Sequence, residues 1–590
     1  MAIEPKRLFD LPYYQLENYP LEHCLSSKVN GSWEGVSTKE LVDRSNEVSR
    51  GLLAMGIKPG DKIGLISNNR YEWHIMDIGI LQIGAINVPI YPTISADDYE
   101  YIFNHAELKL VVVSSEDILA KVNQIKSKVP SLMGVYTFDS ISGEQHWTEI
   151  PAKKDGAEQS EVQKLMDGVN SSDLASIIYT SGTTGKPKGV MLSHDNIMSN
   201  VVASGFRFPA KHGQKSLSFL PVCHIYERTL LYLYLKEGTS VYFAESMETI
   251  GDNIKEVQPE VFSAVPRLLE KVFDKIIAKG QELTGIKKML FFWAVGLGEK
   301  WEPNRANGGF YEWQLGIANK LIFSKWREAL GNNVLAIASG SAALQPRLAR
   351  VFNAAQIPIY EGYGLTETSP VISVNELDRE GLMIGTVGRV LDKVEVKFGD
   401  DGEILCKGPN VMMGYYKDPE KTREVLTEDG WFHTGDIGEM VGPNKDFLKI
   451  TDRKKEMFKT SGGKYIAPQI IENMLKESRF IEQAMVIGEN RKHPAVLVVP
   501  AYEFVMEWCK RHDLVCESNE QIANCEEVQE RIWKDVVKIT KDLGKWEIPK
   551  KMELCKEMWS VENDELTPTL KLKRKRILEK HKEEVDRIYG

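Results

Sequence analysis

The stretch "EVFSAVPRLLEKVFDKIIAKG", residues 260–280, begins as a short buried strand and continues directly into a helix. Its first part is apolar and rich in β-branched and aromatic residues, and its second part repeats apolar residues at helical spacing. Similar apolar runs that precede helix-like segments lie at "KIGLISN" (62–68), "LKLVVVSS" (108–115) and "NVLAIASG" (333–340). This alternation predicts α/β layers whose sheets are largely parallel.

A long helix is predicted earlier in the chain, at residues 37–56, "STKELVDRSNEVSRGLLAMG". Ser37 and Glu40 have the spacing of a capping box, and Gly56 follows the last turn. Towards the other end of the chain, from about residue 390, short hairpins replace this pattern, as in 394–408 with its Asp-Asp-Gly turn. The chain therefore changes its character along its length.

A chain of 590 residues is too long for one hydrophobic core, so at least two domains are expected. After the polar stretch that begins near Asp452, the sequence predicts a helix at 468–478, strands at 484–489 and 494–501, and then charged helices. The predicted fold class is α/β, with a large N-terminal domain (1–452) of layered α/β subdomains plus a β-rich subdomain, and a small α+β C-terminal domain (453–590).

Composition argues against several classes of function. The net charge of -10 and the isoelectric point near 5.8 disfavour a nucleic-acid binder, whose surface is basic. The seven cysteines are scattered without a C-x-x-C pair, which favours a reducing interior without a disulfide framework or zinc site. Because the N-terminus lacks an apolar signal core and the apolar runs are short, we expect a soluble, cytoplasmic protein.

Residues 286–331 stand apart, because aromatic residues alternate there with lysine and arginine. One interpretation is a pair of helices that packs its aromatic side chains inward. The other is contact with a membrane surface.

The stretch "YTSGTTGKPKGV" (179–190) has the composition of a phosphate-binding loop. Glycines let backbone amides point at an anion, hydroxyl side chains add donors, and Lys186 and Lys188 add charge. It is not a Walker A loop, because Pro187 stands where a serine or threonine would follow the lysine. The residues expected to contact phosphate are Thr180, Ser181, Gly182, Thr183, Thr184, Gly185 and Lys188.

Two further segments carry groups that suit a nucleotide. In "IYEGYGLTETSP" (359–370), Tyr363 could stack on a purine and Glu367 is a hard oxygen ligand of the kind Mg²⁺ prefers. In "WFHTGDIGEM" (431–440), Asp436 could accept both hydroxyls of a ribose. Taken alone, each segment is also compatible with an ordinary turn.

Five motifs in this order resemble the adenylate-forming superfamily, which includes acyl-CoA synthetases, peptide-synthetase adenylation domains and beetle luciferases. The motifs are "YTSGTTGKPKGV", "YGLTE" (363–367), "TGD" (434–436), "DRKKEMFKTSGGKY" (452–465) and "LTPTLKLKR" (566–574). "LPVCHIYERT" (220–229), "VPRLLEKV" (265–272) and the 286–331 insertion are similar to the long-chain fatty acyl-CoA synthetase branch.

The resemblance implies a reaction in two halves, with ATP, Mg²⁺, a fatty acid and coenzyme A as ligands. A carboxylate attacks the α-phosphate of ATP to give acyl-AMP and pyrophosphate, and the thiol of coenzyme A then displaces AMP. For the first half the resemblance implies catalytic roles for Lys571, Thr366, Glu367 and His224, with Thr184 and Glu367 at the metal. It implies nucleotide contacts from Gly340, Ser341, Ala342, Glu361, Gly362, Tyr363, Gly364, Asp436 and Arg453.

For the second half, the resemblance implies a mobile C-terminal domain that rotates about Lys455. Lys459 would then act at the active site, with Ser461, Gly462 and Gly463 beside the coenzyme A channel. Two residues keep a second interpretation: His224 could be an ordinary core histidine, and Lys571 could be one more lysine on a solvated helix.

The resemblance therefore implies an AMP-forming long-chain fatty acid–CoA ligase. Three alternatives stay open: a ligase that loads a carrier protein, a ligase for another carboxylic acid, and a binding protein without activity. No nucleic-acid partner is expected, whereas peripheral membrane contact and a homodimer are left open by the sequence.

Overall fold

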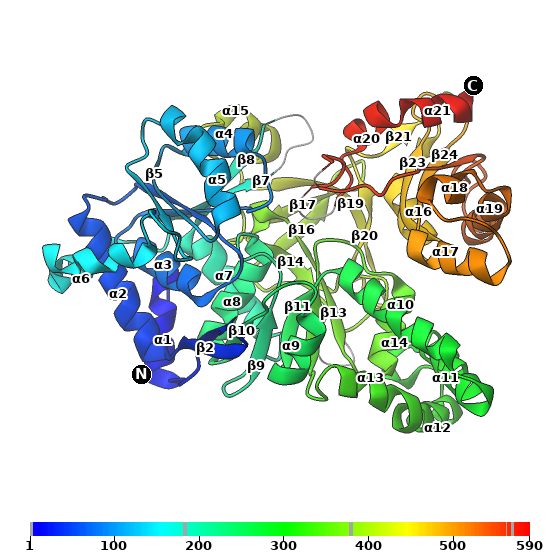
Figure 1. The fold of residues 1–590 in the computed structure, drawn as a ribbon, viewed down its shortest axis with the longest axis horizontal. Coiled ribbons are helices and arrows are strands. Elements are labelled where there is room, and N and C mark those ends of the chain that lie inside the picture. The colour runs from blue at the N-terminus through cyan, green and yellow to red at the C-terminus, as the bar shows by residue number, and fades with distance from the viewer. Residues whose placement is uncertain (1–3, 181–185, 377–380, 562, 568–570) are drawn as a thin grey trace. The chain divides into compact units, whose positions relative to one another are not determined.

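The computed structural model describes residues 4–180, 186–376, 381–561, 563–567 and 571–590. The chain separates into two compact units (Figure 1). The first comprises Met1–Val396, Leu405–His433 and Val441–Leu448, and the second comprises Lys397–Ile404, Thr434–Met440 and Lys449–Gly590. The chain thus passes between the units more than once, and the single boundary between residues 452 and 453 stays a prediction.

Two large sheets form the first unit. The seven-stranded sheet has the order β18 (Gly414–Tyr415), β8 (Lys188–Ser193), β7 (Leu174–Thr180), β4 (Ile86–Ile90), β3 (Lys62–Ile66), β5 (Leu108–Val113) and β6 (Gly134–Thr137). The nine-stranded sheet has the order β15 (Arg389–Val390), β14 (Val371–Val374), β13 (Ile359–Gly364), β12 (Ala336–Ser339), β11 (Val261–Ala264), β9 (Lys215–Ser218), β10 (Ser240–Phe243), β1 (Leu25–Val29) and β2 (Ser32–Val36).

The helices of the first unit connect these strands. They are α1 (Leu11–Asn18), α2 (Thr38–Ala54), α3 (Tyr71–Gln82), α4 (Ala96–Ala106), α5 (Glu116–Ile125), α6 (Gln159–Gly168), α7 (His194–Gly205), α8 (Ile225–Glu237), α9 (Ile250–Val257), α10 (Pro266–Glu282), α11 (Gly285–Gly298), α12 (Gly309–Ala318), α13 (Ser324–Ala329), α14 (Pro346–Ala354) and α15 (Pro419–Val425). A π-helical turn, η6 (Asn319–Phe323), joins α12 to α13.

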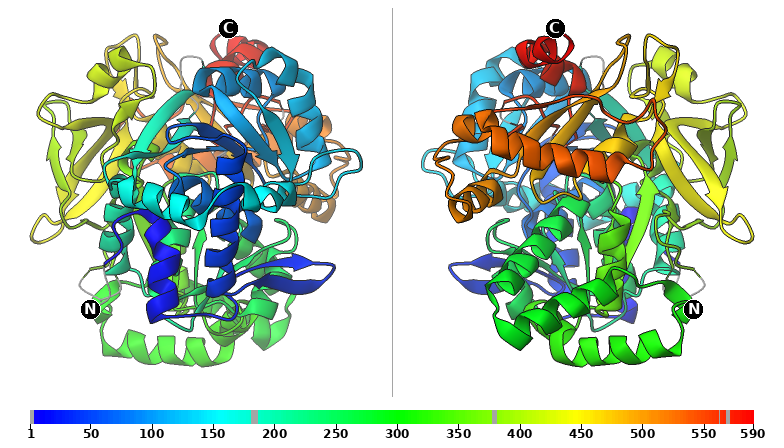
Figure 2. Two further views of the ribbon diagram at one scale, coloured as in Figure 1. Left: turned by 90° about the vertical axis from the view of Figure 1, so that its left-hand side faces the viewer. Right: turned by 90° about the vertical axis from the view of Figure 1, so that its right-hand side faces the viewer.

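Alternate residues of the strands face different cores. The sheets and helices are therefore stacked in layers (Figures 1 and 2). Ile177 of β7 packs with α4 and α5, whereas its neighbour Ile178 packs in a core with α3, α7 and α8. That second core also receives Val241 and Val261 from the nine-stranded sheet, so α7 and α8 lie between the two sheets. On the far side, α10–α14 pack against Ile337 and other residues of β11–β13.

A four-stranded sheet contains residues of both units, in the order β16 (Glu395–Phe398), β17 (Glu403–Lys407), β19 (Phe432–Val441) and β20 (Phe447–Arg453). The second unit adds a hairpin of β21 (Phe458–Lys459) and β22 (Tyr465–Ile466), and a sheet of β23 (Ile481–Ile487), β24 (Ala495–Pro500) and β25 (Met552–Leu554). Its helices are α16 (Pro468–Leu475), α17 (Tyr502–Arg511), α18 (Asn519–Asn524), α19 (Glu526–Thr540), α20 (Arg574–Lys580) and α21 (Lys582–Tyr589).

The local predictions are confirmed where periodicity was strong. Strand β11 and helix α10 occupy 260–280 almost as predicted, and β9–β13 pair in parallel. At α2, the Ser37 side chain accepts the Glu40 N–H at 3.2 Å and Glu40 accepts the Ser37 N–H at 2.8 Å, which completes the capping box. The hairpin within 394–408 is also present, as β16 and β17.

The 286–331 segment has two kinds of aromatic side chain. Phe291, Phe323 and Trp326 are buried in the core of α10–α14, which confirms inward packing for these three residues. Phe310 and Trp313 of α12, in contrast, are 72% and 62% exposed. In the parts of the chain that the structure describes, no helix has the length and hydropathy needed to cross a membrane.

Candidate active site

Three predicted segments of the first unit meet at one edge of the nine-stranded sheet. Strands β9, β11, β12 and β13 run parallel. His224 follows the carboxyl end of β9, Gly340 follows that of β12, and Tyr363 lies within the last residues of β13. In open α/β sheets, ligands bind at this carboxyl edge. The parallel topology therefore gathers His224 with two residues that lie more than a hundred positions further along the sequence.

Gly340 is where these segments come closest. A Cβ added there would lie 3.3 Å from Cζ of Tyr226 and 3.7 Å from the Gly362 carbonyl oxygen. The Tyr226 hydroxyl is buried and has no hydrogen-bond partner among the described residues. Because a buried hydroxyl without a partner is costly, this group fits a site that a polar ligand completes.

His224 and Glu227 fasten the start of α8. Nδ1 of His224 accepts the Tyr226 N–H at 3.1 Å, so this half-buried histidine caps the helix. Glu227 is buried and accepts hydrogen bonds from Ser218 of β9, at 2.6 Å, and from Ser263 of β11. Burial raises the pKa of Glu227 to about 7. These contacts fix the helix start against the sheet edge, where the resemblance places the substrate carboxylate.

Glu361 lies on β13 opposite Ser339 of β12. It is buried, and burial raises the pKa of its carboxyl group to about 8, although the Leu344 N–H donates to it. The side chain is therefore largely uncharged at neutral pH. It holds the segment that follows Gly340 and does not present a negative charge to a nucleotide.

Glu367 is positioned by a tyrosine that the sequence did not indicate. The Tyr415 hydroxyl, on β18, donates to Oε1 of Glu367 at 2.9 Å. The Lys188 Nζ lies 4.9 Å from the centre of the same tyrosine ring. One buried aromatic residue thus connects the predicted metal ligand to a lysine of the phosphate-loop motif, and burial raises its pKa well above the usual range.

The phosphate-loop motif is described only at its two ends. Thr180 ends β7 and pairs with Lys188, the first residue of β8. The candidates Ser181, Gly182, Thr183, Thr184 and Gly185 lie outside the described residues. The hairpin therefore presents the two flanks of the motif side by side.

Tyr363 and Gly364 end strand β13. Tyr363 pairs with Ser373 of β14 and is partly exposed, as a stacking platform must be. A Cβ at Gly364 would lie 1.7 Å from the Pro370 carbonyl oxygen, so only glycine fits there. The turn after Gly364, which contains Thr366 and Glu367, therefore folds back so that Pro370 packs against Gly364.

In the second unit, Asp436 and Arg453, which the resemblance implies as ribose contacts, form an ion pair. Nε of Arg453 lies 3.2 Å from Oδ1 of Asp436, which is 4% exposed. The next residue, Lys454, is held by Asp401 at 2.7 Å and Glu403 at 2.8 Å. Lys455, the predicted hinge, is exposed.

The predicted coenzyme A residues share one small hairpin. Lys459 ends β21 and lies 4.5 Å from the ring centre of Tyr465 on β22. Between the two strands, Ser461, Gly462 and Gly463 are exposed, and Gly463 has a left-handed φ of 74°. These residues project from the core of the second unit and are accessible to a large ligand.

Lys571 does not lie on a helix, so its interpretation as part of a solvated helix face is wrong. Helix α20 begins three residues later, at Arg574. The Lys571 N–H donates to the Thr567 side chain at 3.0 Å, and Leu566 pairs with Leu572 as an isolated bridge. Lys571 therefore lies just before α20, with its backbone hydrogen-bonded to Thr567 and its side chain half-buried.

Tyr415 is a residue of the candidate site that the sequence did not indicate. It lies 48 positions from Glu367, and "MGYYKDPE" (413–420) has no spacing that points to a carboxylate. Among the described residues, no group of three His, Cys, Asp or Glu side chains could hold a metal ion. A single carboxylate such as Glu367 nevertheless fits Mg²⁺, which is commonly bound by one or two carboxylates and by substrate phosphates.

Comparison with known proteins gives matches over nearly the whole chain. A family model described as AMP-binding enzyme matches residues 14–416, and one described as AMP-binding enzyme C-terminal domain matches residues 456–590. A long-chain-fatty-acid–CoA ligase of Mycobacterium bovis is 30% identical, with 95% of this chain and 93% of the relative covered. Long-chain-fatty-acid–CoA ligase 1 of Cavia porcellus is 33% identical, with 96% and 84% covered.

A solved structure shows the same fold. The fatty acyl CoA synthetase of Mycobacterium tuberculosis aligns with a TM-score of 0.63 at 19% identity, and the alignment covers 98% of each chain.

Proposed function

The chain belongs to the AMP-binding enzyme family, and from this premise we propose that it is an ATP-dependent long-chain fatty acid–CoA ligase. It converts a fatty acid and ATP to acyl-AMP and pyrophosphate, and then transfers the acyl group to coenzyme A. The two relatives reported above, which align over more than nine-tenths of the chain, are long-chain-fatty-acid–CoA ligases by name. The names of these relatives favour neither a ligase that loads a carrier protein nor a ligase for another carboxylic acid.

The observation that carries the proposal is the contact of Glu367 with Tyr415, over whose ring Lys188 lies. It joins the phosphate-loop motif to a carboxylate placed for a magnesium–phosphate complex. When bound, Mg²⁺ would neutralise phosphate charge, and Glu367 and Thr184 are the residues proposed to hold it.

For adenylation we assign Thr366, the phosphate-loop hydroxyls and Lys571 to the reacting phosphates. Charge accumulates on phosphate oxygens in this step, so preoriented donors and cations lower the barrier most. His224 caps α8 and orients the acid without acting as a base, because a carboxylic acid is already ionised near neutral pH. Tyr363 stacks on the adenine and Asp436 with Arg453 binds the ribose.

For thioester formation we assign Lys459, Ser461, Gly462 and Gly463 of the β21–β22 hairpin to coenzyme A. Lys455 is the proposed hinge that lets the second unit serve both half-reactions. Support comes from the exposure of this hairpin and of Lys455.

The test is pyrophosphate release measured with acids of increasing chain length, with and without coenzyme A. We expect release with long-chain acids, and acyl-CoA only when coenzyme A is present. Preference for short or aromatic acids would overturn the substrate class while leaving adenylation standing. Release of pyrophosphate without any thioester would overturn the second half of the proposal.

We also propose that this ligase contacts membranes through exposed apolar side chains of α11, α12 and η6, here called the outer face. They are Ile286, Met289, Phe310, Trp313 and Leu321, all more than half exposed. Phe310 and Trp313 stack with ring centroids 5.8 Å apart. Lys287, Lys288 and Lys320 are exposed and follow or precede residues of the outer face directly in sequence, which suits anionic headgroups.

Sedimentation with vesicles of phosphatidylglycerol and phosphatidylcholine tests this face. We expect the double variant F310A/W313A to lose most vesicle binding, and the control F206A to keep it, since Phe206 is 81% exposed elsewhere in the chain. Equal loss in both variants would contradict the assignment. If analytical ultracentrifugation shows a dimer that F310A/W313A dissociates, the face binds a second copy instead.

A further inference from the structure

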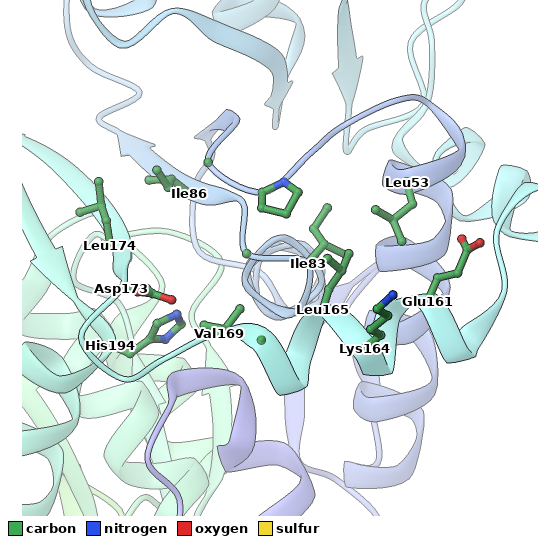
Figure 3. Close-up of a pocket in the computed structure, with 14 residues that line it drawn as sticks. Leu53, Ile83, Ile86, Glu161, Lys164, Leu165, Val169, Asp173, Leu174 and His194 are labelled. Atoms are coloured by element: carbon green, nitrogen blue, oxygen red, sulfur yellow. The ribbon is translucent and has the colours of Figure 1, made fainter.

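A cavity of about 630 Å³ opens in the first unit, away from every residue assigned above (Figure 3). Its walls come from α2, from the turns before β3 and β4, from α6, and from the segments around Leu174 and His194. In Figure 3, Leu53, Ile83 and Leu165 gather at one end, and Asp173 and His194 lie together at the other. The volume and the apolar walls are those of sites that bind small molecules.

The cavity lies at the opposite end of the sheet from the phosphate-loop motif. Leu174 begins β7 and pairs with Ser193, next to His194, whereas Thr180 ends β7 and pairs with Lys188. Six residue steps along an extended strand separate Leu174 from Thr180, or about 20 Å. The cavity is therefore a separate site, connected to the motif by the β7–β8 hairpin.

His194 supplies one polar side chain to the wall of the cavity. It is 2% exposed, and burial lowers its pKa to about 3, so the ring is neutral. Its Nδ1 accepts the Leu8 N–H at 3.3 Å, which leaves the proton on Nε2. Among the described residues, nothing accepts a hydrogen bond from this Nε2–H.

The charged side chains at the cavity are Glu161, Lys164 and Asp173, and all three are exposed at its rim. Two of them are acidic, and Asp173 lies beside His194 (Figure 3). A negatively charged ligand whose polar group reached Nε2 of His194 would meet the carboxylate of Asp173. The rim thus disfavours a carboxylate at the end of the cavity where the N–H donor lies.

We propose that this cavity binds a small, uncharged amphiphile, with its apolar chain along Leu53, Ile83 and Leu165 and an alcohol or carbonyl oxygen at Nε2 of His194. This site is distinct in place and in ligand charge from the acyl site of the proposed reaction. It is tested without reference to ligase turnover.

The experiment measures thiol alkylation at the cavity wall in the full chain. Gly168 lines the cavity, and a Cβ added there meets no atom within 4 Å, so Gly168→Cys introduces a thiol without a clash. N-ethylmaleimide labelling is followed by peptide mass spectrometry, with 1-octanol as the probe and octanoate as its charged counterpart. We expect 1-octanol to slow alkylation at position 168 at least threefold and octanoate to leave it unchanged.

Two further variants assign the effect to the cavity. Ser172→Cys, at an exposed position that does not line the cavity, is the matched control and should be labelled equally fast with and without 1-octanol. Leu165→Trp fills the cavity and should abolish protection at position 168. His194→Phe keeps an aromatic ring against Phe9 but removes the N–H, and should weaken protection.

Absence of protection by 1-octanol would overturn the proposal. So would equal protection by octanoate, equal slowing at position 172, or protection that persists in the Leu165→Trp variant. Circular dichroism of each variant establishes that it is folded, and His194→Phe provides a second test if the tryptophan variant is not.

Discussion

Glu367 and the start of α8 in the first unit, and the proposed coenzyme A residues of the second, differ in how firmly they are held. In the first unit, Glu367 accepts a hydrogen bond from a buried tyrosine, and the start of α8 is tied to two strands through Glu227. In the second unit, Ser461, Gly462 and Gly463 are exposed on a two-stranded hairpin. A site that must stabilise charge requires fixed groups, whereas groups that serve one step only can be presented by a movable surface.

The largest effect is expected for Lys571→Ala. If this lysine of the second unit meets the reacting phosphate, adenylation measured by ATP–pyrophosphate exchange should fall about 10³-fold, or roughly 4 kcal/mol. Conversion of supplied acyl-AMP to acyl-CoA should be nearly unchanged. Lys575→Ala, at an exposed position on α20, is the control and should leave both steps intact. Equal loss in both half-reactions would mean that Lys571 is structural.

Lys455→Pro tests whether the second unit has to move. Proline restricts the backbone at a hinge, so thioester formation should fall more than about a hundredfold while adenylation stays largely intact. The two half-reactions are measured separately, as above. If both half-reactions are lost to the same extent, Lys455 is not the hinge or the variant is misfolded.

Glu227→Gln tests how firmly the first unit is held. The folded pKa of about 7 lies above the unfolded value, so the folded chain binds more protons between about pH 4.5 and 7, and stability must fall as pH rises through this window. Between pH 5 and 7 the loss is about 2 kcal/mol. The free energy of unfolding, measured by urea denaturation at several pH values, should lose this pH dependence in the variant. An unchanged pH dependence would contradict the assignment.

Tyr415→Phe is expected to have the smallest effect. It removes one hydrogen bond to a charged carboxylate while keeping the ring beneath Lys188. Such a hydrogen bond contributes about 1.5 kcal/mol, so the adenylation rate should fall roughly tenfold. The Mg²⁺ concentration for half-maximal rate should rise. Tyr416→Phe is the neighbouring control, and a similar change there would show that the loss is not specific to Glu367.

Much of the local structure could be predicted because it depends on neighbours in sequence. The capping box at Ser37, the strand–helix unit at 260–280 and the hairpin at 394–408 use contacts within a few residues. The pair of Asp436 and Arg453 was also predicted, but through resemblance to a family and not from spacing. Periodicity in 286–331 predicted helices, yet it could not tell which aromatic side chains would be buried.

The amino-acid sequence by itself determined the α/β class, the order of the motifs and the kind of chemistry, because period, turn residues and motif composition are local properties. Only the tertiary structure decided that Tyr415 positions Glu367, that Tyr226 lies against Gly340, and that Lys571 lies outside α20. It also produced the cavity at His194 and the exposed face of α12. These features depend on which distant segments the parallel sheets bring together, and on the burial that results.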